Sequence, residues 1–290
     1  MLKGIATATI LGQLRVGVVC VSLFIQNHIF NNRTAANGEK AAAEFGFPFT
    51  ADLAAAVSDA DVVITSVSMD SDLIEIAEKL AELLKPGTIV VDTSTVAQAT
   101  AVKAAEIFAA KQIGFIDGPV SGGPEGAKKA TMVMMLGGDA ATIEKIKPVT
   151  DAISRMAIRM GDNGAGQATK AVNQIMVAGI NQAVTEALAF GQASGLNMDD
   201  VIALISQGAA GNWFLEQRGP NMTKDIFTPG FKMVLHNKDL NICKNMAADL
   251  GVSLPVIDNT LDNYAALLEQ GHGDDDISTL YRTKKAMFQK

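Results

Sequence analysis

Three polar side chains that could act on a small substrate share one face of a predicted helix. Residues 164–174 read G-A-G-Q-A-T-K-A-V-N-Q, and the two glycines break the backbone before the helix begins. Lys170, Asn173 and Gln174 are spaced by three and four residues, so an amine and two amides point into the same space. A buried lysine shifts its pKa readily and suits proton transfer near neutral pH. The segment predicts Lys170 as a general acid/base, although a lone lysine after a glycine turn is more often a solvated surface residue.

A serine flanked by glycines could bind an anion. Residues 117–123 read D-G-P-V-S-G-G and follow a short apolar run, 113–116, that is typical of the end of a strand. Ser121, Gly122 and Gly123 combine a hydroxyl with unhindered backbone N–H groups, which suits a carboxylate. The alternative is an ordinary turn built from turn-forming residues.

A second lysine lies just inside a later predicted helix. Residues 231–240 read F-K-M-V-L-H-N-K-D-L, which places Lys238 next to Asp239. Lys238 is a candidate for contact with a ligand, and the alternative is a surface lysine paired with Asp239.

Together and in this order, the three segments resemble the β-hydroxyacid dehydrogenase family, which includes 3-hydroxyisobutyrate dehydrogenase and tartronate semialdehyde reductase. The resemblance runs from about Asn31 to the C-terminus. It implies that segment 117–123 holds the substrate carboxylate, that Lys170 is catalytic and that Lys238 approaches the cofactor. Many relatives have two asparagines where this chain has Asn173 and Gln174, so which of the two contacts the substrate stays open.

The resemblance implies a reversible reduction of a small aldehyde acid, or oxidation of the matching β-hydroxy acid, in a homodimer or homotetramer. The substrate would be a small carboxylic acid whose identity the sequence does not name. Trp213 could line the pocket or belong to the core. Two alternatives stay open: a non-catalytic relative that kept the fold, and an imine reductase-like enzyme, a type that typically replaces the lysine.

A nicotinamide cofactor is implied by further matches at predicted strand ends. An acidic residue at the end of the second strand favours NAD, whereas an Arg there accommodates the 2′-phosphate of NADP. Here Asn32, Arg33 and Thr34 occupy that place, which favours NADP over NAD. Family positions that line the nicotinamide ribose are matched by Val67, Ser68 and Thr95.

The first thirty residues depart from the family pattern. A dinucleotide-binding domain should open with a strand and G-x-G-x-x-G, which brings the backbone close to the pyrophosphate at a helix N-terminus. Counting back from Arg33 places this fingerprint near residues 9–14, which read T-I-L-G-Q-L. This window contains a single glycine, Gly12, where the fingerprint needs three. Either the phosphate loop is truly missing or the N-terminal sequence has been altered, and cofactor affinity is in doubt.

Composition excludes several other classes of protein. The chain has 290 residues, 48% hydrophobic and 19% charged, with a net charge of −7 and no basic run, which argues against a nucleic-acid partner. Cys20 and Cys243 make no disulfide framework, and neither has a metal-ligand spacing to His28, His236 or His272. No metal site is therefore expected.

The longest strongly apolar run, 16–25, is shorter than the ~20 residues that a membrane helix needs. Arg15 interrupts the N-terminal apolar stretch and no clear cleavage site follows, so a secretory signal is not expected. The sequence favours a cytoplasmic location.

The pattern along the chain predicts an α/β protein with a Rossmann-like doubly wound parallel sheet followed by an all-α domain. We expect a dinucleotide-binding domain over 1–161 and an all-helical substrate and dimerisation domain over 162–290. Periodicity and turn residues predict strands over 60–67, 88–91, 113–116 and 132–136, and helices over 52–57, 70–84, 95–110 and 165–193.

Overall fold

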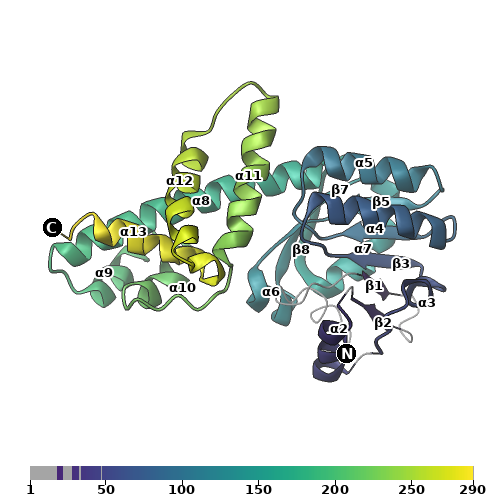
Figure 1. Ribbon diagram of the computed structural model, residues 1–290, viewed down its shortest axis with the longest axis horizontal. Coiled ribbons are helices and arrows are strands. Elements are labelled where there is room, and N and C mark those ends of the chain that lie inside the picture. Colours follow the sequence, from purple (N-terminus) through teal and green to yellow (C-terminus); the bar gives the residue numbers. More distant parts are fainter. Residues whose placement is uncertain (1–17, 22–27, 33, 47, 290) are drawn as a thin grey trace. The chain divides into compact units, whose positions relative to one another are not determined.

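The computed structural model describes residues 18–21, 28–32, 34–46 and 48–289, and the chain divides into two compact units, 1–170 and 171–290. The first unit is an α/β layer structure and the second is helical (Figure 1). The division falls inside the long helix α8 (Ala165–Ala193), which has the bounds expected from sequence. None of the described helices combines the length and apolar composition that a membrane span requires.

The first unit is built on one sheet with helices on both faces. Its strands are β1 (Val18–Val21), β2 (His28–Asn31), β3 (Val62–Thr65), β4 (Ile89–Asp92), β5 (Gly114–Asp117), β6 (Val120–Ser121), β7 (Met132–Gly137) and β8 (Ser154–Gly161). Their order is β2-β1-β3-β4-β5-β7-β6, and β8 also pairs with β7. The helices are α2 (Ala35–Phe45), α3 (Leu53–Val57), α4 (Asp70–Leu83), α5 (Gln98–Ala109), α6 (Gly123–Lys129) and α7 (Ala140–Ile153).

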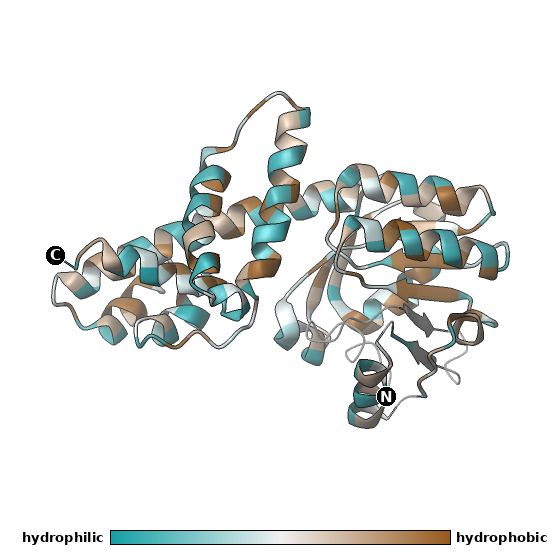
Figure 2. Ribbon diagram, viewed as in Figure 1, coloured by the Kyte–Doolittle hydropathy of each residue, from teal (hydrophilic) through white to brown (hydrophobic). Residues whose placement is uncertain are grey.

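Alternate residues of the central strands feed two separate cores. In β3, Val62 and Ile64 pack into a cluster with α2, α6 and α7, whereas Val63 packs with α3, α4 and α5. β4 and β5 alternate in the same way, so these strands are apolar on both faces, as expected of strands covered by helices on both sides. The central strands accordingly appear mainly brown, the hydrophobic colour, in Figure 2.

The fold class expected from sequence is confirmed, but the sheet is mixed rather than wholly parallel. β3, β4 and β5 run parallel, whereas β1 pairs antiparallel with both β2 and β3. For β1 and β2 the length of the connection accounts for the antiparallel pairing, because residues 22–27 alone separate these strands and a parallel crossover needs about a dozen residues or more. β7 also pairs antiparallel with β5 and β6.

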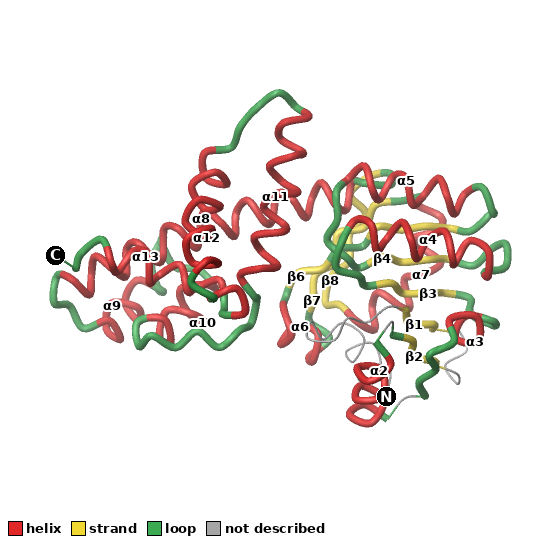
Figure 3. The backbone as a smooth tube through the Cα atoms, viewed as in Figure 1, coloured by secondary structure: helices red, strands yellow, loops and turns green. Residues whose placement is uncertain are grey.

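The second unit consists of helices joined by loops (Figure 3), with one isolated β-bridge between Lys232 and Asp276. After α8 come α9 (Met198–Ile205), α10 (Trp213–Met222), α11 (Met233–Asp249), α12 (Pro255–Glu269), the short 3₁₀ helices η1 (His272–Asp274) and η2 (Ile277–Thr279), and α13 (Leu280–Ala286). One core joins α8 to α9, α10 and α13, and a second joins α8 to α11 and α12. α8 is therefore the shared support of both cores.

Local signals account for some of the element ends. Of the two caps that the sequence offers for α3, Thr50 and Asp52, the structure uses Asp52, whose carboxylate accepts the N–H groups of Ala54 and Ala55. Helix α5 begins three residues later than expected, at Gln98, because Asp70 Oδ1 accepts the N–H of Ala97 and fixes the entry to the helix there. Met132 and Met134 of β7 fill the core, whereas Met135 between Met134 and Leu136 is half-buried.

Candidate active site

The start of α8 is capped by a carboxylate from the sheet. Asp117, at the end of β5, accepts the N–H of Gly164 on Oδ1 at 2.8 Å and the N–H of Gln167 on Oδ2 at 3.1 Å. Helix N-termini leave such N–H groups without intrahelical partners, and a negative charge there is favourable. Burial raises the pKa of Asp117, against the effect of these hydrogen bonds. Asp117 therefore acts in this unit as the anchor of the helix that carries Lys170.

Two glycines allow the helix to approach the sheet so closely. A Cβ on Gly166 would lie 2.4 Å from the carbonyl oxygen of Met135 and 2.5 Å from that of Asp117. A Cβ on Gly137 would lie 2.5 Å from Asp117 Oδ1. A Cβ at position 166 would push the helix backbone away from the sheet, whereas a Cβ at position 137 would displace the Asp117 carboxylate that anchors the helix. Gly166 of the sequence motif is therefore required for packing.

The side chain of Gln167 ties the first turn of α8 to the loop after β4. Its Nε2 donates to the carbonyl oxygen of Ser94 at 2.9 Å, and its Oε1 accepts the N–H of Val96 at 3.2 Å. Gln167 is only 1% exposed. Neither Asp117 nor Gln167 is predicted as an anchor from the sequence, although Gln167 lies three residues before Lys170 and therefore on the same helix face.

Lys170 is held inside the first unit beside the serine–glycine turn. Its side chain is 7% exposed, and Nζ donates to the carbonyl oxygen of Val120 at 3.0 Å. The reading of Lys170 as a solvated surface residue is therefore wrong. Val120 is followed directly by Ser121, which is half-buried, and by Gly122 and Gly123, which are exposed.

The turn at Gly122 and Gly123 uses backbone conformations that favour glycine. Their φ angles are +136° and +61°, and a Cβ on Gly122 would come within 3.3 Å of the Met132 Cα. Short α6 begins at Gly123.

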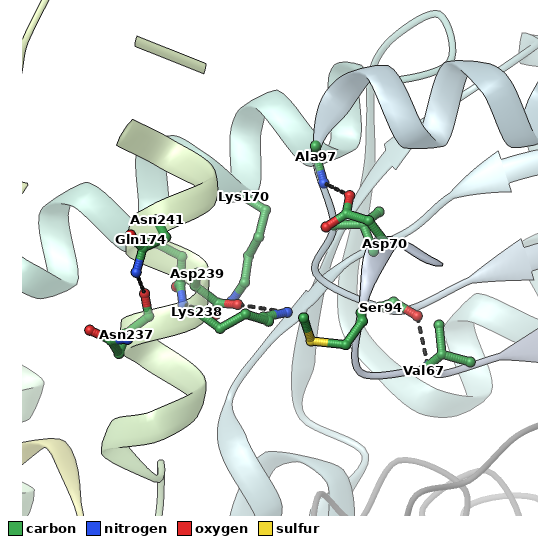
Figure 4. Close-up of polar contacts among 12 residues, drawn as sticks. Val67, Asp70, Ser94, Ala97, Lys170, Gln174, Asn237, Lys238, Asp239 and Asn241 are labelled. Atoms are coloured by element: carbon green, nitrogen blue, oxygen red, sulfur yellow. Dashed lines mark hydrogen bonds and ion pairs between the residues drawn. The ribbon is translucent and has the colours of Figure 1, made fainter. Parts of the chain in front are cut away.

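A separate polar chain lies in the helical unit. Asn173 Nδ2 donates to Gln174 Oε1 at 2.7 Å, Gln174 Nε2 donates to Asp239 Oδ2 at 2.6 Å, and Lys238 Nζ lies 3.0 Å from Asp239 Oδ1. Figure 4 shows the last pair as a dashed line. Lys238 is thus paired with Asp239, as the alternative expected, but its side chain is half-buried and not a surface side chain. Gln174 is 1% exposed and both ends of its amide are used, whereas Asn173 is half-buried.

A buried hydrogen-bond network joins the ends of β3 and β4. Asp92 Oδ1 accepts the hydroxyls of Thr65 and Ser94, both at 2.7 Å. Ser94 Oγ accepts the N–H of Val67 at 2.8 Å, a bond that Figure 4 shows as a dashed line. Asp92 Oδ2 is buried and has no hydrogen-bond partner among the described residues. Burial raises the pKa of Asp92 from its usual 3.8 to about 6, in spite of the two hydroxyl donors.

The raised pKa of Asp92 predicts a pH-dependent cost to stability. Because the folded protein binds this proton more tightly than the unfolded chain, stability falls as pH rises from about 4 to about 6 and stays lower above that. The shift of roughly two units corresponds to on the order of 3 kcal/mol. Relative to wild type, the Asp92→Asn variant should therefore gain about that much unfolding free energy between about pH 4 and pH 7.

Urea denaturation of both proteins across this range measures the difference. Asp117 titrates in both proteins, so its contribution largely cancels. A free-energy difference that stays constant with pH would show that Asp92 titrates normally.

The residues expected at the adenosine end of the cofactor are described only in part. Asn32 is buried, and its Oδ1 accepts the N–H of Thr34 at 2.8 Å, just before α2 begins. Arg33 and residues 9–14 lie outside the described part of the chain.

Of the other candidates, Trp213 is 59% exposed, so its assignment to the core is wrong; Arg218 lies over its ring at 5.2 Å. His236 is buried against the Tyr264 hydroxyl, and His272 pairs with Asp275. Among the described residues, no group of His, Cys, Asp and Glu side chains has the arrangement of a metal site.

Comparison with known proteins identifies the family. Residues 164–283 match the family described as NAD-binding of NADP-dependent 3-hydroxyisobutyrate dehydrogenase, and residues 26–161 match the NAD binding domain of 6-phosphogluconate dehydrogenase. A probable 3-hydroxyisobutyrate dehydrogenase from Mycobacterium bovis is 31% identical over 87% of each chain. The chain belongs to the 3-hydroxyisobutyrate dehydrogenase family.

Other members of this family act on related compounds. The NAD-dependent L-serine dehydrogenase of Pseudomonas aeruginosa is 32% identical over 78% of this chain and 80% of its own. Among solved structures, the 3-hydroxyisobutyrate dehydrogenase of Mycobacterium tuberculosis with L-serine has a TM-score of 0.81 at 27% identity, over 97% of this chain and 94% of its own. The family is one of oxidoreductases that act on β-hydroxy acids.

The 3-hydroxyisobutyrate dehydrogenase family binds NAD or NADP, and part of this chain fits such a cofactor. Ligands of parallel sheets bind outside the carboxyl ends of the strands. Ser68 and Thr95 follow β3 and β4 at that edge, and both are half-buried. The hydroxyls of these residues suit the nicotinamide half, whereas the family match begins at residue 26, after the segment in which a phosphate loop was expected.

Proposed function

We propose that this protein interconverts a small β-hydroxy acid and the corresponding semialdehyde, with NADP preferred over NAD and Lys170 as general acid/base. One observation carries the proposal: Lys170 is a buried amine, and its Nζ is 3.0 Å from the carbonyl oxygen of the residue that precedes Ser121. The proposed proton donor and the proposed anion-binding turn therefore lie in one compact unit. This is the pairing that a substrate with a carboxylate and a nearby carbonyl requires.

Each residue has a role in this proposal. Ser121, Gly122 and Gly123 bind the carboxylate through the hydroxyl and backbone N–H groups. In reduction, Lys170 Nζ gives a proton to the carbonyl oxygen as that oxygen becomes a hydroxyl; in oxidation, the neutral amine takes the proton back. A bound nicotinamide supplies or accepts the hydride at the carbonyl carbon.

Of the two amides after Lys170, we assign Asn173 to the substrate. Gln174 is fully engaged by Asn173 and Asp239, so its place in the protein is that of a support for its neighbours. Lys238, Val67, Ser68 and Thr95 are assigned to the nicotinamide end of the cofactor, and Asn32, Arg33 and Thr34 to the adenosine end. The homodimer or homotetramer and the cytoplasmic location stay predictions from the sequence.

A substrate panel tests the function. The purified protein should oxidise 3-hydroxyisobutyrate or L-serine with NADP or NAD, or reduce 2-hydroxy-3-oxopropionate with the reduced cofactors. These compounds are taken from the names of the relatives, among them the Escherichia coli 2-hydroxy-3-oxopropionate reductase, which is 41% identical over 49% of this chain. Reduction of a cyclic imine with no turnover of any acid would contradict the proposal and favour imine reductase chemistry.

The cofactor preference depends on Arg33. A guanidinium next to the 2′-phosphate contributes about 1.5–3 kcal/mol, so Arg33→Ala should weaken NADPH by roughly ten- to a hundredfold. NADH, which lacks this phosphate, should be nearly unaffected. Fluorescence titrations of both cofactors measure the effect, and equal weakening of NADPH and NADH would remove Arg33 from the phosphate site.

A further inference from the structure

Ser94, in the loop after β4, is hydrogen-bonded both to the loop after β3 and to helix α8. Ser94 contacts the loop after β3 through its side chain, because Oγ accepts the N–H of Val67 at 2.8 Å. It contacts α8 through its main chain, because its carbonyl oxygen accepts Gln167 Nε2 at 2.9 Å. Ser94 is buried, so both bonds are shielded from water.

Ser94 itself is fixed by Asp92. The Ser94 hydroxyl donates to Asp92 Oδ1 at 2.7 Å, which orients its lone pairs toward the N–H of Val67. The carboxylate has one oxygen without a described partner, and its ionised form is costly to bury. A hydroxyl oriented only for folding would not need a buried charge, since a neutral acceptor could orient it at lower cost.

These contacts bear on where the two reacting groups lie. In the proposed function, Val67 and Ser68 face the nicotinamide and Lys170 delivers the proton, and Gln167 lies one helical turn before Lys170. The hydride goes to the carbon and the proton to the oxygen of the same carbonyl. The relative positions of the nicotinamide and Lys170 must therefore be correct to within a fraction of an ångström.

We propose that Ser94, oriented by Asp92, is a positioning residue that holds the nicotinamide-side loop and the Lys170 helix in one fixed frame. It does not touch the reacting atoms. Its side chain fixes the position of the Val67 backbone N–H, and its carbonyl group fixes the position of the Gln167 side chain. The inference rests on the proposed function, which assigns Val67 to the cofactor and Lys170 to the substrate.

Two variants separate the two contacts of Ser94, the hydroxyl bond to Val67 and the carbonyl bond to Gln167. Ser94→Ala removes the bond to Val67 but keeps the carbonyl group that binds Gln167, so the cofactor should bind about tenfold more weakly. Gln167→Leu removes the arm to α8 and misplaces Lys170, so kcat should fall by about ten- to a hundredfold while cofactor affinity stays within about twofold. The solvent deuterium isotope effect should rise in Gln167→Leu and stay unchanged in Ser94→Ala, because only the former disturbs proton delivery.

A matched control is available in the helix that follows this loop. Thr100 donates its hydroxyl to Asp70 Oδ1 at 2.5 Å, which joins α5 to α4 and not to Val67 or Gln167. Thr100→Val should lower the midpoint of thermal unfolding about as much as Ser94→Ala does, with cofactor affinity and kcat unchanged.

The outcomes are distinguishable. If the wild-type chain turns over none of the acids, the proposed function fails. If it is active and Ser94→Ala affects cofactor affinity no more than Thr100→Val does, or Gln167→Leu weakens the cofactor as much as it lowers kcat, the positioning role is wrong. The unfolding midpoints identify a variant that merely fails to fold. The isotope effect of the other variant then decides whether the positioning role holds: it should be raised in Gln167→Leu and unchanged in Ser94→Ala.

Discussion

Replacing Lys170 by alanine should lower kcat by about 10²- to 10⁴-fold, the range typical of general acid–base groups. The expected loss lies in the chemical step, because Lys170 Nζ is the only group that the proposal places at the substrate oxygen. The fold should survive, since the anchors of α8 are Asp117 and Gln167, not Lys170. Steady-state rates with a substrate found in the panel measure the effect.

Two further variants isolate the amine from the side chain that carries it. Lys170→Met keeps an apolar side chain of similar length at a buried position, so it should be as inactive as the alanine variant. Lys147, an exposed lysine paired with Asp151 on α7, provides a control whose replacement by alanine should change nothing. If either Lys170 variant retained activity within about threefold of wild type, Lys170 would have no part in proton transfer.

The second large effect concerns cofactor affinity. A strand followed by G-x-G-x-x-G presents backbone N–H groups to the pyrophosphate, and residues 1–30 contain no such pattern. The connection between β1 and β2, residues 22–27, is also too short for the crossover helix whose N-terminus would face the phosphates. Losing these contacts amounts to several kcal/mol, so NADPH should bind at least about a hundredfold more weakly than in a protein with the loop.

Replacing residues 1–27 by a strand, G-x-G-x-x-G and a crossover helix tests this directly. The replacement should restore at least about a hundredfold in NADPH affinity, because β3, β4 and their loops are already formed. Micromolar binding by the unaltered chain would contradict the expectation and would mean that another backbone segment serves the phosphates.

The sequence predicted the elements whose signals are local. Apolar runs that are buried on both faces marked β3, β4 and β5, and the glycine-delimited apolar stretch 165–193 gave α8 its bounds. The antiparallel pairing of β1 was missed because it depends on the length of one connection and not on the strand's own residues. The eight-residue strand β8 was also missed, since its exposed Met156, Ile158 and Met160 lie on an edge strand without the pattern of a buried one.

The residues with functional groups in the candidate site were easier to predict from sequence than the residues that hold them in place. Lys170, Ser121 and Lys238 carry functional groups and stand in recognisable motifs. Asp117, Gln167 and Asp92 act through partners about 50, 73 and 27 residues away in sequence, and no local pattern announces such contacts. The glycines at 164 and 166 were seen as helix breakers, whereas Gly166 is needed for close packing against the sheet.

Transfer of labelled hydride is the most direct test of the central claim. The wild-type protein is incubated with the aldehyde form of an acid that the substrate panel identifies as a substrate and with NADPH deuterated at nicotinamide C4, each face being labelled in turn, and the product is examined by mass spectrometry. We expect a hydroxy acid that carries a single deuterium from one labelled face, and at least about a hundredfold less of it in the same time when Lys170→Met replaces wild type. A wild-type product without deuterium from either face, or label transferred undiminished by Lys170→Met, would contradict the central claim.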